Sequence, residues 1–129
     1  MAQTITHITL LVNDYEEAIH FYTQKLNFNL VEDTWVSESK RRVAVAPRKC
    51  PVAILLVKAS NKEQLIRVGN QTGGRVFFYL HTDSFNEDYQ RLVANNVKII
   101  KGPTIEPWGK VAVFEDLYGN QWDLVEPMS

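Results

Sequence analysis

Apolar and polar residues along this chain follow one pattern twice. Residues 5–12 form an apolar run rich in β-forming side chains, and a helix start follows directly. Residues 75–82, seventy positions later, form a second such run, which is again followed by a helix start. A likeness that recurs at a fixed spacing is typical of a duplicated structural unit.

The later parts of the two copies also match, at a spacing of sixty-eight positions. Residues 42–45 (Arg-Val-Ala-Val) correspond to residues 110–113 (Lys-Val-Ala-Val), and residues 54–57 correspond to residues 122–125. The two spacings agree to within two positions along the whole copy. The sequence therefore predicts a structural repeat.

Each copy is predicted to form a βαβββ module. Asp14 with Glu17, and Ser84 with Glu87, have the spacing of capping boxes, which satisfy amide donors of a first helical turn. Asn27 is expected to end the first helix in a left-handed conformation. The predicted strands lie at 4–12, 28–36, 41–47, 52–58, 75–83, 97–102, 109–115 and 120–126, and the predicted helices at 14–26 and 84–95.

The length of 129 residues fits one compact domain. We expect residues 1–129 to form a single domain of two modules, at about 4–58 and 75–126. A helix within residues 60–70, capped by Ser60, is expected to link them. Glycines at the end of this linker are expected to make it flexible.

Composition and charge exclude several classes of function. A net charge of −1 gives no field that would gather nucleic acid or anionic lipid, and no apolar run is long enough to span a bilayer. The first residues lack the features of a secretion signal. The one cysteine, Cys50, cannot form an internal disulfide, and we expect an incidental thiol. These observations favour a cytoplasmic protein with no nucleic-acid or membrane partner.

Three stretches of the sequence resemble the vicinal oxygen chelate superfamily, which contains glyoxalase, the bleomycin-resistance proteins and extradiol dioxygenases. The first combines a histidine strand, Thr6–Asp14, with a helix that carries a Phe-Tyr pair, Ala18–Tyr22, and with Leu26–Phe28. The others are Pro107–Lys110 and the closing hairpin Phe114–Leu124, in which an aspartate precedes a Gly-Asn turn. The likeness spans nearly the whole chain.

The resemblance implies an α+β fold of two βαβββ modules. Their curved, mixed and mostly antiparallel sheets would surround a cleft, with the helices outside. It also implies that metal ligands sit on the first and last strands of each module, facing the cleft. At these positions the chain has His7, Leu55, Phe77 and Asp123. The repeat pairs His7 with Phe77 and Leu55 with Asp123, which independently supports this placement.

The four positions do not form a metal site that chemistry favours. A catalytic divalent ion normally needs three protein ligands, and only His7 and Asp123 offer donors. Leu55 and Phe77 place hydrocarbon at the other two positions. His81 lies four residues beyond Phe77, about 13 Å along a strand, which is too far to replace it. We therefore predict no metal and no cofactor.

Without a metal, the same face is predicted to bind a small aromatic or amphipathic molecule. Trp35 and Trp108 are expected at the ends of strands, where their rings could close over a ligand, with Trp108 in a mobile flap. A basic cluster, Lys40-Arg41-Arg42, would favour an anionic ligand if it rims the cleft. The predicted ligand-binding residues are His7, Thr9, Trp35, Leu55, Phe77, Tyr79, His81, Trp108, Gln121 and Asp123.

An enzyme remains the alternative. His7 and Asp123 are the candidate catalytic residues of a glyoxalase-like lyase or an extradiol-dioxygenase-like protein, acting with a metal or as an acid–base pair. The resemblance also implies a homodimer whose interface forms the ligand cleft. Open sheet edges give a physical reason to expect such pairing, because exposed edge strands invite further strands.

Overall fold

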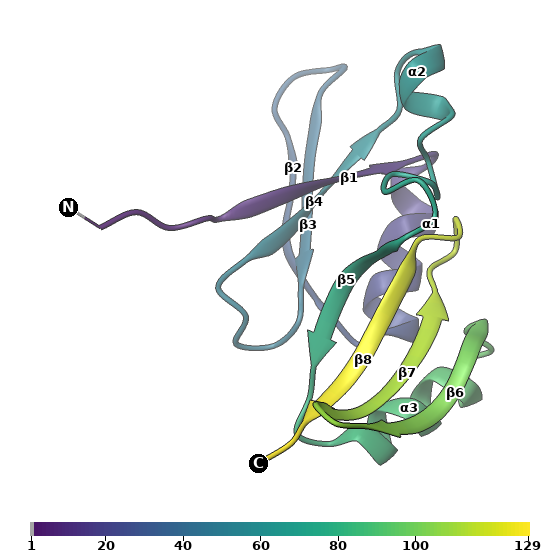
Figure 1. Cartoon of the computed structure of the whole chain (residues 1–129). Coiled ribbons are helices and arrows are strands. Elements are labelled where there is room, and N and C mark those ends of the chain that lie inside the picture. Colours follow the sequence, from purple (N-terminus) through teal and green to yellow (C-terminus); the bar gives the residue numbers. More distant parts are fainter. Residues whose placement is uncertain (1) are drawn as a thin grey trace. The chain divides into compact units, whose positions relative to one another are not determined.

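The computed structural model describes residues 2–129 of the chain. It divides into two compact units, and the boundary falls between Val68 and Gly69. Each unit contains one four-stranded mixed sheet and a helix that contacts it (Figure 1). The βαβββ order of both copies and the α+β class are confirmed.

The first unit has the strand order β1-β4-β3-β2. Strand β1 runs parallel to β4, and the other neighbours are antiparallel. Its elements are β1 (His7–Val12), α1 (Tyr15–His20), the π-helical turn η1 (Phe21–Lys25), β2 (Asn29–Trp35), β3 (Arg41–Ala46), β4 (Ala53–Lys58) and α2 (Lys62–Leu65).

The second unit repeats this topology with the order β5-β8-β7-β6. Strand β5 is parallel to β8, and the other neighbours are antiparallel. Its elements are β5 (Val76–His81), α3 (Phe85–Ala94), β6 (Ile99–Glu106), β7 (Gly109–Glu115) and β8 (Gln121–Pro127).

The pairing of the strands confirms the repeat at the level of single residues. Thr9 pairs with Leu55 between β1 and β4, and Tyr79 pairs with Asp123 between β5 and β8. These two pairs are related by the spacings of seventy and sixty-eight found in the sequence. The pairing register of β3 with β4 differs by one residue from that of β7 with β8. Val43 pairs with Leu56, whereas Ala112, and not the equivalent Val111, pairs with Leu124.

One face of each sheet packs into a hydrophobic core. In the first unit, alternate residues of the strands are fully or almost fully buried, and Tyr22 from η1 is buried as well. In the second unit, the Trp122 ring lies 4.4 Å from Phe78 and 5.8 Å from Phe114 between ring centroids. The alternation leaves the opposite face of each sheet for other contacts. The buried strand residues are Leu10, Val12, Val43, Val45, Ile54 and Leu56 in the first unit, and Ala112, Phe114, Trp122 and Leu124 in the second.

The first helix widens in its second half, where a regular helix over 14–26 was expected. The Leu26 amide donates to the Phe21 carbonyl, five residues back, at 3.2 Å. The Thr23 hydroxyl donates to the Ile19 carbonyl at 2.7 Å, which competes with the regular helical ladder at that carbonyl. Asn27 then ends the helix with a φ of 63°, so the predicted left-handed residue is confirmed.

Of the three predicted helix N-caps, the structure confirms one. The Asp14 carboxylate accepts the Glu17 amide at 2.9 Å, as predicted. Asn61 caps α2, accepting the Gln64 amide at 2.9 Å, so the prediction of Ser60 as that cap was wrong by one residue. At α3 the Ser84 side chain makes no capping bond.

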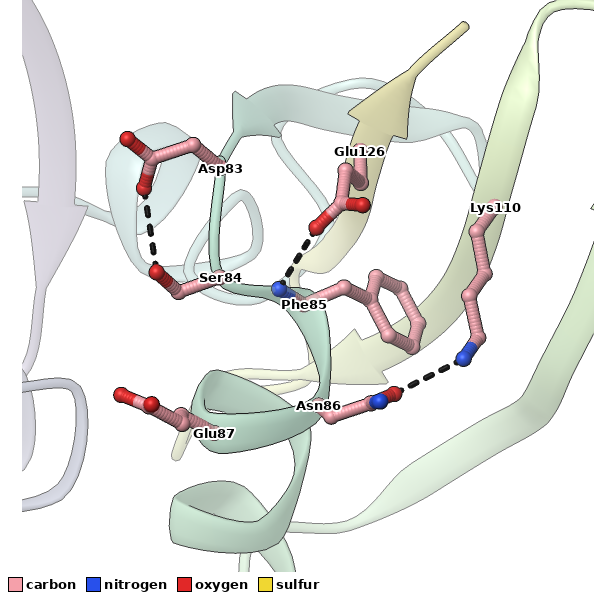
Figure 2. Close-up of a pocket in the computed structure, with 7 residues that line it drawn as sticks. All are labelled: Asp83, Ser84, Phe85, Asn86, Glu87, Lys110 and Glu126. Atoms are coloured by element: carbon pink, nitrogen blue, oxygen red, sulfur yellow. Dashed lines mark hydrogen bonds between the residues drawn. The ribbon is translucent and has the colours of Figure 1, made fainter.

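The amide at the start of α3 is instead satisfied from strand β8. Glu126 Oε1 accepts the Phe85 amide at 2.9 Å, as Figure 2 shows. The Ser84 hydroxyl donates to Asp83, and the Ser84 amide donates to the Thr82 hydroxyl at 2.9 Å. The predicted Ser84–Glu87 capping box is therefore wrong, because a carboxylate 41 residues away occupies the helix start.

The turn between β7 and β8 is organised by one buried aspartate. Asp116 Oδ1 accepts the amides of Tyr118, Gly119 and Asn120 at 2.9, 3.0 and 2.9 Å. Its Oδ2 accepts the Asn120 side-chain amide at 2.9 Å. Asp116 and Asn120 are each only 4% exposed. Four donors thus converge on one carboxylate and hold the closing hairpin.

The segment that opens the second unit contains glycines in two different environments. Gly69 has a φ of +78°, and a Cβ at this position would lie 1.8 Å from the Tyr118 carbonyl oxygen. Gly73 and Gly74 also have positive φ, but a Cβ at either would meet nothing within 4 Å in the part of the chain described. The backbone at Gly69 is therefore packed closely against the closing turn, and that at Gly73 and Gly74 is open.

Strand β6 is longer than the sequence predicted. It continues to Glu106, which pairs with Gly109, so that only Pro107 and Trp108 form the turn to β7. Two irregularities in the register flank Lys101, and they interrupt the alternation that marks a strand. Between residues 2 and 129, no helix is long and apolar enough to cross a membrane.

Candidate functional site

The face of the first sheet that lies opposite the core carries one row of residues across all four strands. Thr9 on β1 pairs with Leu55 on β4, Leu55 pairs with Ala44 on β3, and Ala44 pairs with Glu32 on β2. Leu55 packs against a buried cluster of three small residues, Ala44, Ala46 and Ala53. The surroundings of Leu55 on this face are therefore apolar.

The same row in the second unit has a different chemistry. Tyr79 on β5 pairs with Asp123 on β8, Asp123 pairs with Val113 on β7, and Val113 pairs with Lys101 on β6. Tyr79 is 65% exposed, and Asp123 is half-buried. An aromatic ring and a carboxylate therefore stand side by side on an open sheet face.

Burial and a nearby positive charge act in opposite directions on the pKa of the Asp123 carboxyl. Partial burial raises the pKa of the Asp123 carboxyl above its usual value of 3.8, since the charged form loses contact with water. The positive charge of Lys101 lowers the same pKa, but burial is the larger effect. No hydrogen bond to this carboxylate is found within residues 2–129.

A β-bulge changes the orientation of Phe77. The register of β5 shifts between Val76 and Phe78, and Phe77 has no partner residue on β8. The Phe77 and Phe78 rings stack with centroids 4.2 Å apart and planes at 15°. Successive residues of a regular strand point to opposite faces, so the bulge has brought both rings to the same side. Phe77 therefore extends the Phe78–Trp122 stack and does not stand beside Asp123.

Trp35 also lies away from the open face of its sheet. It pairs with Arg41, whose guanidinium lies 5.5 Å from the Trp35 ring centroid and 5.3 Å from the Tyr15 ring centroid. Arg41 also forms ion pairs with Glu16 on α1, at 2.5 Å, and with Asp33, at 2.8 Å. Trp35 thus shares the helix-bearing side of the sheet with Arg41, whereas Thr9 and Leu55 lie on the other side.

The basic residues of this hairpin are neutralised by partners. Arg41 donates to both oxygens of Asp33 at 2.8 Å, and this contact lowers the pKa of the Asp33 carboxyl below 3.8. Arg42 forms an ion pair with Glu32 at 2.9 Å. The expected attraction of Lys40-Arg41-Arg42 for an anionic ligand therefore finds no support in the structure, since two of the three charges are already paired.

The remaining predicted residues are distributed over both units. His7 is exposed next to Ala53, and its Nδ1 lies 2.9 Å from the Thr6 hydroxyl. His81 and Gln121 flank the Tyr79–Asp123 pair two residues along their strands, hence on the same face. Trp108 is 61% exposed at the two-residue turn, and its carbonyl accepts the Met128 amide at 3.0 Å.

The donors present do not fit a catalytic metal ion. Of the four positions that the resemblance assigns to metal ligands, His7 and Leu55 lie in the first unit and Phe77 and Asp123 in the second, so each unit offers one donor at these positions. Across residues 2–129, no group of three or more histidine, cysteine, aspartate or glutamate side chains gathers. A site built for a divalent ion would require at least three such donors.

A hollow of about 260 Å³ lies at the start of α3, away from the Tyr79–Asp123 face. Figure 2 shows that its polar groups contact one another: Lys110 Nζ donates to Asn86 Oδ1 at 2.7 Å, beside the Glu126–Phe85 bond. Lys110 also lies 5.0 Å from the Phe85 ring centroid. These contacts join α3 to β7 and β8, so the hollow is part of the packing of the second unit. It is lined by Asp83, Ser84, Phe85, Asn86, Glu87, Lys110 and Glu126.

Comparison with known families decides the classification. The sequence model of the Glyoxalase/Bleomycin resistance protein/Dioxygenase superfamily matches residues 4–124. The chain belongs to this superfamily. The duplicated βαβββ topology and the mixed sheets agree with that membership, and the predicted resemblance is confirmed.

Three similar proteins each match nearly the whole length of the chain. An uncharacterized protein of Shewanella frigidimarina (strain NCIMB 400) is 50% identical over 128 residues, 98% of this chain and 95% of that protein. The crystal structure of UcmS2 has a TM-score of 0.85 and 29% identity, and covers 98% of this chain and 99% of that chain. The crystal structure of TnmS3, an antibiotic binding protein from Streptomyces sp. CB03234, has a TM-score of 0.82 and 28% identity, with 98% of both chains covered.

Sequence reasoning missed two residues of the second row. Val113 and Lys101 complete the line that begins at Tyr79 and Asp123. The repeat spacing could not have identified Val113, because it matches Ala44 with Ala112 and the register of β7 is shifted by one residue. Lys101 could not be found either, because the irregularities on either side of it hide which face its side chain takes.

Proposed function

We propose that this superfamily member is a metal-independent binding protein for a small aromatic or amphipathic molecule. The observation that carries the proposal is the open face of the second unit, where the exposed Tyr79 ring stands beside the half-buried Asp123 carboxylate. Flat aromatic surface with a few polar groups is the usual composition of a small-molecule site. The antibiotic-binding relative supports the same class of function.

The equivalent face of the first unit is proposed as a second contact surface for small molecules. Leu55, set in its alanine cluster, would supply apolar contact there, and Thr9 and His7 would supply polar groups on the same face. The protein is proposed to act in the cytoplasm and to require no cofactor. We set aside a metal-dependent lyase or dioxygenase activity at His7 and Asp123, because the donors at the four ligand positions are too few for a metal.

Truncating Tyr79 is expected to weaken ligand binding. With 2-naphthol as the probe, Tyr79→Ala should reduce affinity by about 1–2 kcal/mol, roughly 5- to 30-fold, through loss of aromatic contact. Trp35→Ala is the matched control, because Trp35 is 63% exposed, close to the 65% of Tyr79, but lies on the other side of its own sheet. Isothermal titration calorimetry measures both. A large effect of Trp35→Ala with none of Tyr79→Ala would move the site to the helix-bearing side.

Metal binding provides a separate test. The purified protein, titrated with zinc, nickel or ferrous iron, is expected to show no near-stoichiometric uptake at micromolar affinity, because three converging ligands are lacking. Calorimetry and elemental analysis give the measurement. Uptake of one ion per chain at that affinity would contradict the proposal and favour the enzyme alternative.

We further propose that the protein forms a homodimer. Strands β1, β2, β5 and β6 are the edges of the two sheets, and β2 and the segment around β1 carry exposed apolar side chains. Exposed edges of this kind favour association with another strand. Light scattering coupled to size exclusion should give twice the mass of 14.8 kDa. A monomer mass at micromolar concentration would exclude a stable dimer.

A further inference from the structure

Asp123 lacks the hydrogen bonds and ion pairs that several other acidic side chains form. Asp33, Glu16 and Glu32 form ion pairs with arginines, and Asp116 accepts four hydrogen bonds. Within residues 2–129, the Asp123 carboxylate accepts no hydrogen bond and forms no ion pair. A carboxylate that is partly removed from water without donors costs free energy. A donor supplied by a ligand would recover this cost.

The residues around Asp123 limit what that ligand can be. The Tyr79 ring lies directly beside it in the ladder, and the apolar Val113 lies on its other side. Within residues 2–129, the charged and titratable groups that the ladder places on this face of the second unit are Tyr79 and His81 on β5, Lys101 and Glu106 on β6, and Glu115 on β7. Glu115 is paired with Lys98 at 3.7 Å. The carboxylate is therefore an acceptor set in aromatic and apolar surroundings.

The repeat offers an internal comparison. The position equivalent to Asp123 in the first unit is Leu55, which lies between Thr9 and Ala44 in the same row. The first copy thus provides an apolar contact at this place, and the second copy provides a hydrogen-bond acceptor. The two copies therefore differ in chemistry at this position.

We propose that the open face of the second unit selects flat aromatic ligands that carry a hydrogen-bond donor, an amine or a phenolic hydroxyl, which Asp123 accepts beside the Tyr79 ring. This inference rests on the proposed binding function and specifies its ligand class. Hydrogen bonds to a charged acceptor are stronger than those between neutral groups, so the donor contributes selectivity as well as affinity. A ligand carboxylate at the same place would be repelled.

Three probes with one ring system test the inference: naphthalene, 2-naphthol and 2-naphthoate. The wild-type protein should bind 2-naphthol about tenfold more tightly than naphthalene, and 2-naphthoate more weakly than either. In Asp123→Leu, which introduces the residue of the first copy, the ratio of naphthol to naphthalene affinity should fall towards one. Glu115→Gln removes the same charge from the same face and should leave the ratio near ten.

The outcomes separate this inference from the function it rests on. If naphthalene binds and the preference for 2-naphthol is missing, or survives Asp123→Leu, the role of Asp123 is wrong while a binding function stands. If no probe binds the wild-type protein, the binding function itself fails and takes the ligand class with it.

Discussion

Replacing Asp116 with alanine is expected to lower the free energy of unfolding by about 3–4 kcal/mol. The carboxylate accepts three backbone amides and one side-chain amide, and both Asp116 and Asn120 are only 4% exposed. Alanine would leave these donors in a region that water does not reach freely, so each loses a charge-assisted bond without replacement. Urea denaturation followed by far-ultraviolet circular dichroism measures the loss.

Two further variants make the Asp116 result specific. Asp116→Asn keeps the shape of the side chain and one acceptor oxygen, so the backbone amides can still be bonded. Its NH₂ group would face the Asn120 side-chain donor and lose that bond. The loss of unfolding free energy should therefore be about half of that for alanine. Asp14→Ala removes an exposed aspartate that caps a helix through the Glu17 amide, and should cost about 1 kcal/mol. Equal losses for Asp116→Ala and Asp14→Ala would mean that the buried turn contributes no more than an ordinary cap.

Truncating Trp122 is expected to destabilise the second unit by about 3–5 kcal/mol. The side chain is 2% exposed and is stacked between Phe78 and Phe114, so Trp122→Ala leaves a large cavity among aromatic rings. Part of the loss is the transfer free energy of the indole, and part is the unfilled volume. Chemical denaturation again gives the free energy.

Trp108→Ala provides the control for Trp122→Ala. Trp108 is 61% exposed, and its bond to Met128 is made by the backbone carbonyl, which alanine retains. Its loss should stay below about 1 kcal/mol. Trp122→Phe, which keeps an aromatic ring, should lie between the two alanine variants. If Trp108→Ala lost as much unfolding free energy as Trp122→Ala, the aromatic stack would not contribute more to stability than the turn does.

The duplicated topology could be predicted because it depends on patterns that persist over whole elements. The two spacings in the sequence correctly anticipated that Thr9 with Leu55 is equivalent to Tyr79 with Asp123. Regular alternation tells which residues share a face wherever a ladder is continuous. The βαβββ order of elements along each copy, the α+β class and the left-handed Asn27 were predicted from the sequence.

The orientation of single aromatic side chains could not be predicted in the same way. Phe77 has the position of a residue on the open face, yet a bulge directs its ring onto Phe78. Trp35 occurs at the end of a strand whose register also shifts, between Leu30 and Glu32, and it stacks on Arg41. One extra residue in a strand reverses the sheet face on which the next side chains lie, and the amino-acid composition does not reveal where such a bulge occurs.

Contacts between distant parts of the chain were also beyond sequence reasoning. The Ser84-Glu87 spacing is a sound signal for a capping box, but Glu126 reaches the same helix start from strand β8. Local signals cannot reveal that another element already supplies the acceptor. The pairing of Arg41 with Asp33 and Glu16 is a second example, since the three residues come from β3, β2 and α1.

The two glycine environments near residue 70 bear on how the protein can be engineered. A fluorescent protein, an epitope or a protease site placed between Gly73 and Gly74 would enter open space and leave both halves of the duplication undisturbed. The same cargo at Gly69 would push against the Tyr118 carbonyl and, through it, the buried turn that Asp116 holds.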